Sequence, residues 1–189
     1  MLYSEIMKLE IVNGRWLDLS GDSWKIDRSA IIAASARIGA FSEIGPYVEI
    51  GDDSRIGEYV QIERSASIGR SVHIGSHAFI WDSAVISESV AIAAEVRIGP
   101  HVHVVGSPLQ IVGPEYVVYP FSPGLIGIGC QIGSIVQWEK SVESLAGEHD
   151  ISDEDVLLYR DYVELIRDWM VDAEAAGTFF VAKEGVTNE

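Results

Sequence analysis

Aliphatic residues recur at every sixth position through the middle of the chain. Fourteen of them follow without a break: Ile26, Ile32, Ile38, Ile44, Ile50, Ile56, Ile62, Ile68, Ile74, Ile80, Ile86, Ile92, Ile98 and Val104. Four residues after each isoleucine stands Ala, Val or Ser. A period of six matches neither a helix (about 3.6) nor a simple strand (about 2), so it predicts a short strand, a turn and the same again. Stacking such coils pairs each strand with its equivalents about 4.8 Å away and forms an inner ladder of isoleucines.

Glycine often follows the aliphatic residue. It stands at Gly39, Gly45, Gly51, Gly57, Gly69, Gly75 and Gly99. A corner with positive φ favours glycine, and so does a close approach between two backbones. The pattern leaves both explanations open.

The run SARIGA-FSEIGP-YVEIGD-DSRIGE (35–58) resembles the motif of the hexapeptide-repeat transferase superfamily, and the resemblance extends over 26–106. It implies a mainly β fold, a left-handed parallel β-helix with three hexads, or 18 residues, in each triangular coil. Left-handed coiling is an exception to the usual right-handed crossover. The resemblance also implies a homotrimer with sites between protomers, acyl transfer to a sugar or nucleotide-sugar acceptor, and an acyl donor such as acyl-coenzyme A.

The flanking sequence divides the rest of the chain. We expect an N-terminal β-hairpin cap over 1–25, the hexapeptide-repeat β-helix over 26–106, an irregular β extension over 107–133, a helical region over 134–176 and a flexible tail over 177–189. For the extension, a further partial coil and a β-ribbon both fit the pattern of glycines and prolines.

Local signals support these assignments. Asn13-Gly14 stands between two strand-like runs, which indicates a hairpin, and Trp16 and Trp24 are expected to cover the open end of the prism. Ser134 with Gln137, and Ser152 with Asp155, have the spacing of helix N-terminal caps.

The second helix has two apolar stripes. One consists of Val156, Tyr159, Val163, Ile166 and Met170, and the other of Leu158, Tyr162, Leu165 and Trp169. Two packing surfaces and a single wide buried face both explain them.

Composition limits the function. The net charge is −16, and residues 134–189 with 14 acids and 4 bases contribute −10 of it. Phosphate repulsion argues against nucleic-acid binding. No run of 18 apolar residues and no basic, apolar leader is present, so we expect neither a membrane span nor a signal peptide. The single cysteine, Cys130, fits a reducing, cytoplasmic compartment and is expected to be buried.

Residues 18 apart should stack on the prism, which predicts columns of side chains. His77 falls between Tyr59 and Glu95, and a carboxylate beside an imidazole can orient it as a base. The resemblance to acyltransferases, which use a histidine base, makes His77 and Glu95 the candidate catalytic pair. His77 stands three residues after the aliphatic position, whereas the best-known sugar-nucleotide acyltransferases place their histidine two residues after it.

Other columns predict ligand contacts. His73 falls above Arg55 and Arg37, and three potential cations in a column suit a phosphate or carboxylate. His101 falls above Ser83, Ser65 and Tyr47 and is a second candidate, together with the aromatic Tyr59. Zinc-dependent γ-class carbonic anhydrases share the implied fold. The spacings of His73 with His77 and of His101 with His103 differ from theirs, so no metal site is predicted.

Three functions therefore remain. The first is an acyltransferase-like enzyme at the cleft between trimer protomers. The second is a non-catalytic trimeric protein that binds, and sequesters, a small nucleotide-like ligand. The third is a structural trimerisation module. The unbroken coils, which carry no inserted loop, favour the second over the first, whereas the resemblance favours the first.

Overall fold

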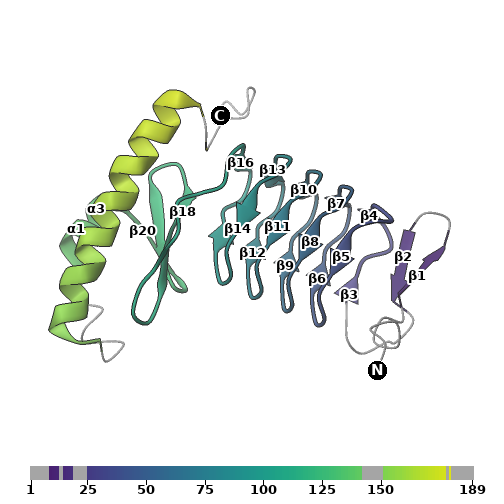
Figure 1. The fold of residues 1–189 in the computed structure, drawn as a ribbon, viewed down its shortest axis with the longest axis horizontal. Coiled ribbons are helices and arrows are strands. Elements are labelled where there is room, and N and C mark those ends of the chain that lie inside the picture. Colours follow the sequence, from purple (N-terminus) through teal and green to yellow (C-terminus); the bar gives the residue numbers. More distant parts are fainter. Residues whose placement is uncertain (1–8, 13–14, 19–24, 142–150, 178, 180–189) are drawn as a thin grey trace, which may run out of the picture.

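The computed structural model describes residues 9–12, 15–18, 25–141, 151–177 and 179. Figure 1 shows a prism of stacked coils with an antiparallel hairpin at one end and a small sheet with a long helix at the other. The predicted fold class, a left-handed parallel β-helix with an N-terminal hairpin and C-terminal helices, is confirmed.

Two-residue strands form three flat parallel sheets, one for each face of the prism. The arginine face consists of β5 (Arg37–Ile38), β8 (Arg55–Ile56), β11 (His73–Ile74) and β14 (Ala91–Ile92). The groove face consists of β3 (Lys25–Ile26), β6 (Glu43–Ile44), β9 (Gln61–Ile62), β12 (Phe79–Ile80) and β15 (Arg97–Ile98). The third face consists of β4 (Ile31–Ile32), β7 (Glu49–Ile50), β10 (Ser67–Ile68), β13 (Val85–Ile86) and β16 (His103–Val104).

The isoleucine ladder forms the core. Strands pair in a register of 18 residues, so that Ile62, Ile80 and Ile98 lie directly above one another. From Ile32 to Val104 every residue of the ladder is buried. The small positions are buried too, and Ser42 shows how a polar residue is tolerated there: its hydroxyl donates to the Gly57 carbonyl and accepts from the Val60 N–H.

Close packing, and not positive φ, explains most of the glycines. A Cβ added to Gly75 lies 2.3 Å from the Ala94 nitrogen of the next coil, and none of the repeat glycines has positive φ. The left-handed conformation falls two residues later, on eleven successive corners from Phe41 to His101, none of which is glycine. Each such residue costs about 1–2 kcal/mol, which the ladder of hydrogen bonds on either side offsets.

The segment after the prism is a ribbon and not a further coil. An antiparallel sheet joins β17 (Ile111–Val112), β18 (Val117–Ser122), β19 (Leu125–Ile128) and β20 (Gln131–Ser134). It continues the groove face, because the Gly99 N–H donates to the Phe121 carbonyl. Tyr119 is fully buried in it and donates its hydroxyl to the Gly129 carbonyl at 2.8 Å. Burial raises the pKa of this hydroxyl well above its usual range.

Both predicted helix caps are present. The Ser134 hydroxyl accepts from the Gln137 N–H and the Gln137 carboxamide accepts from the Ser134 N–H, at the start of α1 (Ile135–Ser141). The Ser152 hydroxyl accepts from the Asp155 N–H at the start of α3 (Asp153–Ala176), which ends in a left-handed cap at Gly177.

The long helix buries one of its two apolar stripes. Val156, Tyr159, Val163, Ile166 and Met170 are buried, and the helix packs on β18. The second stripe is only partly covered, since Leu165 is 54% exposed while Tyr162 and Trp169 are half-buried. The core therefore extends from the prism through the ribbon to one side of α3 (Figure 1).

The structure describes parts of both the predicted N-terminal cap and the predicted C-terminal tail. Strands β1 (Leu9–Val12) and β2 (Arg15–Asp18) form the predicted hairpin, and β2 lies against β3 and β4. The proposed cover by Trp16 and Trp24 lies outside the described side chains. In the predicted tail, Phe179 is buried against Trp169.

The prediction that Cys130 is buried is wrong. It is exposed. The turn between β19 and β20 brings it to the surface directly after Gly129, whose φ is +55°.

Candidate functional site

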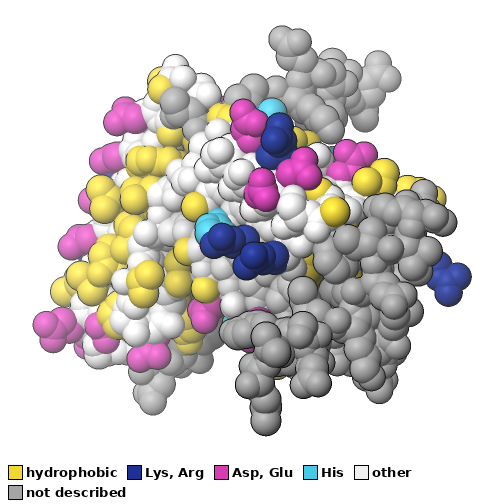
Figure 2. Space-filling view, turned by 45° about the vertical axis from the view of Figure 1, so that its right-hand side comes forward, with side chains coloured by type: hydrophobic (Ala, Val, Ile, Leu, Met, Phe, Trp, Pro, Cys, Tyr) yellow, Lys and Arg dark blue, Asp and Glu magenta, His cyan; other side chains and the backbone are white. Residues whose placement is uncertain are grey.

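A column of potential cations runs up the arginine face. Arg37, Arg55 and His73 lie opposite one another in register, one coil apart, and all three are exposed. Within the described part of the chain, none of these three side chains forms a hydrogen bond or an ion pair. Figure 2 shows histidine and basic side chains next to one another on the surface of the prism. The column thus presents two permanent positive charges, and a third when His73 is protonated, without an acidic partner among the described side chains.

Glycines lie beside this column. Gly39, Gly57 and Gly75 follow the three buried isoleucines of β5, β8 and β11, and a Cβ on any of them would meet the backbone of the next coil. Glu58 and Ser76 come directly after two of these glycines, before the next edge of the prism.

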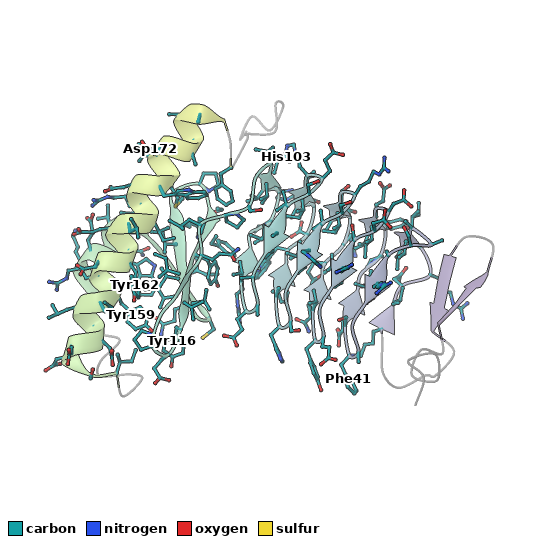
Figure 3. The ribbon with its side chains drawn as sticks, viewed as in Figure 1. Phe41, His103, Tyr116, Tyr159, Tyr162 and Asp172 are labelled. Carbon is teal, nitrogen blue, oxygen red and sulfur yellow. The ribbon has the colours of Figure 1, made fainter. Side chains whose placement is uncertain are left out.

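The next edge carries a stack of rings, the aromatic edge. Tyr59 lies between Phe41 and His77, with ring centroids 4.9 Å and 5.0 Å apart and interplanar angles of 15° and 4°. All three have positive φ, which directs the side chains outward at the corner. Figure 3 shows Phe41 at this outer edge of the prism. The column predicted from 18-residue spacing is therefore present.

The predicted His77–Glu95 pair is not joined by a bond. Glu95 lies one coil above on the aromatic edge, but no hydrogen bond joins its side chain to His77, whose ring stacks on Tyr59. A base held by a carboxylate hydrogen bond is not assembled at this position.

The remaining predicted ligand residues lie elsewhere. Tyr47 and His101 are on the edge that follows the groove face, separated from the arginine face. Tyr47 is 66% exposed. His101 instead meets a carboxylate, with its Nε2 3.5 Å from Asp82 Oδ2. The candidate residues thus divide into two groups, one of which joins Arg37, Arg55, His73, Tyr59 and His77 on a single face and its edge.

Two contacts were missed by reading the sequence in columns. One is His101 with Asp82, 19 residues apart, and the other is His103 with Ser87, 16 residues apart. Side chains that lean along the strand reach a diagonal neighbour, so a search at offsets of 16 to 19 would have found both.

A groove of about 380 Å³ lies on the groove face. It is lined by Lys25, Asp27, Glu43, Gln61 and Glu63, together with Gly45. Hydrogen bonds from the Ser29 hydroxyl and N–H lower the pKa of Asp27. None of the predicted site residues lines this groove.

Sequence comparisons match the prism. The family model described as the GMPPB C-terminal domain matches residues 26–119, just under half of the chain. The six-residue ladder is unbroken and its strands pair in an 18-residue register. The chain therefore has the hexapeptide-repeat fold. No curated protein sequence matches it.

Solved structures of several hexapeptide transferases are similar to this hexapeptide-repeat protein. GDP-perosamine N-acetyltransferase from Caulobacter crescentus, in complex with coenzyme A and GDP-perosamine, is 24% identical over 44% of this chain and 49% of that one, with a TM-score of 0.38. The chain thus spans about half the length of that enzyme. The acetyltransferase domain of PglB from Neisseria gonorrhoeae is 16% identical over 43% and 53%, with a TM-score of 0.23.

A third structure covers more of the chain. LpxA from Bacteroides fragilis, a UDP-N-acetylglucosamine acyltransferase, is 16% identical over 77% of this chain and 82% of that one, with a TM-score of 0.29. At such identities and scores the likeness does not extend to activity. The function of this hexapeptide-repeat protein therefore rests on its own residues.

The described residues offer neither a cluster of metal ligands nor a helix suited to a bilayer. No group of three His, Cys, Asp or Glu side chains within them is close enough to hold a metal ion. None of the helices they form is both long and apolar enough to span a bilayer.

Proposed function

We propose that this hexapeptide-repeat protein binds a phosphorylated, nucleotide-like small molecule on its arginine face. The observation that carries the proposal is the column of Arg37, Arg55 and His73, in register and without an acidic partner among the described residues. Guanidinium groups bind phosphate through paired, charge-assisted hydrogen bonds. Coils about 4.8 Å apart place successive cations along the length of a diphosphate.

The surroundings of the column support the same ligand. The edge that follows the arginine face offers Tyr59, which is 47% exposed. The net charge of −16 repels anions in general, so a local cluster of unpaired cations is needed to hold one. In the homotrimer that we propose, a second protomer closes the open side of the site.

Replacing Arg55 tests this function. We expect Arg55→Ala to weaken the binding of ADP and of inorganic pyrophosphate about tenfold or more, because one charge-assisted contact contributes about 1.5–3 kcal/mol. Isothermal titration calorimetry at low salt measures the two affinities.

Arg64→Ala is the matched control. Arg64 is an exposed arginine on another edge, so its removal changes the net charge by the same amount. Equal affinities in the Arg55 and Arg64 variants, or no binding of either ligand to the unchanged protein, would contradict the proposal.

Acyl transfer at His77 is the second candidate. The stack on Tyr59 holds the imidazole at the rim of the arginine face. His77 would take the proton of an acceptor hydroxyl or amine as that group attacks the carbonyl carbon of acyl-coenzyme A, and would return it to the sulfur as the carbon–sulfur bond breaks.

Release of the thiol measures this reaction. With acetyl-coenzyme A and a UDP-linked amino sugar, we expect His77→Ala to lower the rate of thiol release at least about 100-fold. Ser71→Ala alters another corner residue with positive φ and should leave the rate unchanged. If the His77 variant retains the full rate, the base is not His77.

A further inference from the structure

A serine and a histidine meet on the third face, at the end of the prism next to the ribbon. The Ser87 hydroxyl lies 2.9 Å from His103 Nε2, within hydrogen-bond distance. Both side chains are half-buried. Figure 3 shows His103 at the upper margin of the prism, toward the end of α3 that carries Asp172. A hydroxyl bonded to an imidazole nitrogen is the arrangement that activates a serine as a nucleophile.

The stacking of the coils does not require a serine at position 87. Ser87 occupies the position after the aliphatic residue, and no other hexad has a hydroxyl or thiol side chain there. The others hold Asp27, Ala33, Gly39, Gly45, Gly51, Gly57, Glu63, Gly69, Gly75, Trp81, Ala93, Gly99 and Val105. Coils with alanine or glycine at this position stack without a hydroxyl. The fold therefore does not require Ser87.

The environment suits an acyl group. His103 lies opposite Val85 in the parallel register, and Val105 follows two residues later, so apolar side chains adjoin the pair.

A backbone donor is also at hand. The N–H of Glu88, the residue directly after Ser87, has no hydrogen-bond partner among the described residues. In serine hydrolases the N–H that follows the nucleophile stabilises the oxyanion of the tetrahedral intermediate. Only in this hexad does a hydroxyl residue come directly before that position.

We propose that Ser87 is a nucleophile, with His103 as its general base, and that it cleaves esters of short acyl groups. Ser87 Oγ attacks the ester carbonyl carbon while its proton passes to His103 Nε2. The carbon–oxygen bond to the alcohol breaks, and the alcohol leaves with that proton. Water then attacks the acyl-serine and gives its proton to His103, the bond to Ser87 Oγ breaks, and the serine recovers the proton as the carboxylic acid leaves.

This activity is independent of the arginine face. It requires no residue of β5, β8 or β11, so Arg55→Ala, which weakens anion binding, leaves it unchanged. The two proposals can therefore fail separately.

Covalent labelling tests the nucleophile. We expect a fluorophosphonate probe to label the full-length protein at Ser87, as located by mass spectrometry of tryptic peptides, and p-nitrophenyl acetate to be hydrolysed with a burst. Ser87→Ala should abolish the labelling. His103→Gln should lower the labelling rate at least about 100-fold, the usual contribution of a general base.

The controls separate reactivity from folding. Ala33 and Ala93 occupy the position of Ser87 in other coils, so Ser87→Ala should unfold at the same temperature as the unchanged protein. Ser89→Ala removes an exposed serine two residues away and should leave the labelling unchanged. Absence of labelling, labelling that persists in Ser87→Ala, or equal labelling rates with and without His103 would overturn the proposal.

Discussion

Replacing Ile80 with alanine is expected to lower the free energy of unfolding by about 3–5 kcal/mol. Ile80 is fully buried and lies between Ile62 and Ile98 in the ladder of the groove face. Its loss removes apolar contacts in two directions and leaves a cavity, because the backbone hydrogen bonds of the coils above and below keep the walls from closing. Urea unfolding followed by circular dichroism measures the change.

Ile31→Ala is the control for this prediction. Ile31 also belongs to a two-residue strand, but it points outward and is 54% exposed. We expect a change of less than about 1 kcal/mol, because little apolar area returns to water. Similar losses in the two variants would show that the ladder is not the main source of stability.

Replacing Gly75 with alanine is expected to destabilise the protein by about 3 kcal/mol or more. The new Cβ would lie 2.3 Å from the Ala94 nitrogen and 2.6 Å from the Ala93 carbonyl carbon. Both atoms belong to the backbone of the next coil, so relief requires the coils to separate and the ladder hydrogen bonds to lengthen. The melting temperature in differential scanning calorimetry should fall by several degrees.

Ala93 provides a matched comparison one coil further on. It occupies the same hexad position as Gly75, and its N–H donates to the Gln110 side chain, not to another coil of the prism. We expect Ala93→Gly to cost no more than about 1 kcal/mol, the usual entropic penalty of glycine. If the Gly75→Ala variant is as stable as Ala93→Gly, close packing between coils is not the reason for glycine at position 75.

The 18-residue spacing predicted which side chains stack directly above one another. It did not predict which side chains reach a diagonal neighbour in the next coil. The alignment of Phe41, Tyr59 and His77 follows from backbone register alone, since each strand pairs with the one 18 residues away. The contacts of His101 with Asp82 and of His103 with Ser87 depend on side-chain rotamers, which a period in the sequence does not contain.

The expected His77–Glu95 pair shows the same limit. The two residues share an edge, but an aromatic neighbour on the other side offers His77 a stacking partner, and the ring lies parallel to Tyr59. Adjacent columns therefore predict proximity and not hydrogen bonding.

Away from the prism, the sequence predicted features that involve neighbouring residues. It did not predict features that depend on how distant segments pack. The caps at Ser134 and Ser152 form as predicted, because a cap involves only residues three positions apart. The ribbon instead of a further coil, and the exposure of Cys130, depend on how β18 to β20 fold back on one another.

The sequence by itself determined the β-helix, its register, its core and the columns on its faces, because one six-residue period repeats without interruption and every coil constrains the next. Tertiary structure decided which polar groups meet. It left Arg37, Arg55 and His73 unpaired among the described residues, placed Tyr47 and His101 on a different edge, and brought Ser87 to His103. The physical reason is that hydrophobic burial follows the period of the chain, whereas a hydrogen bond requires a distance and an angle that only the packed coils supply.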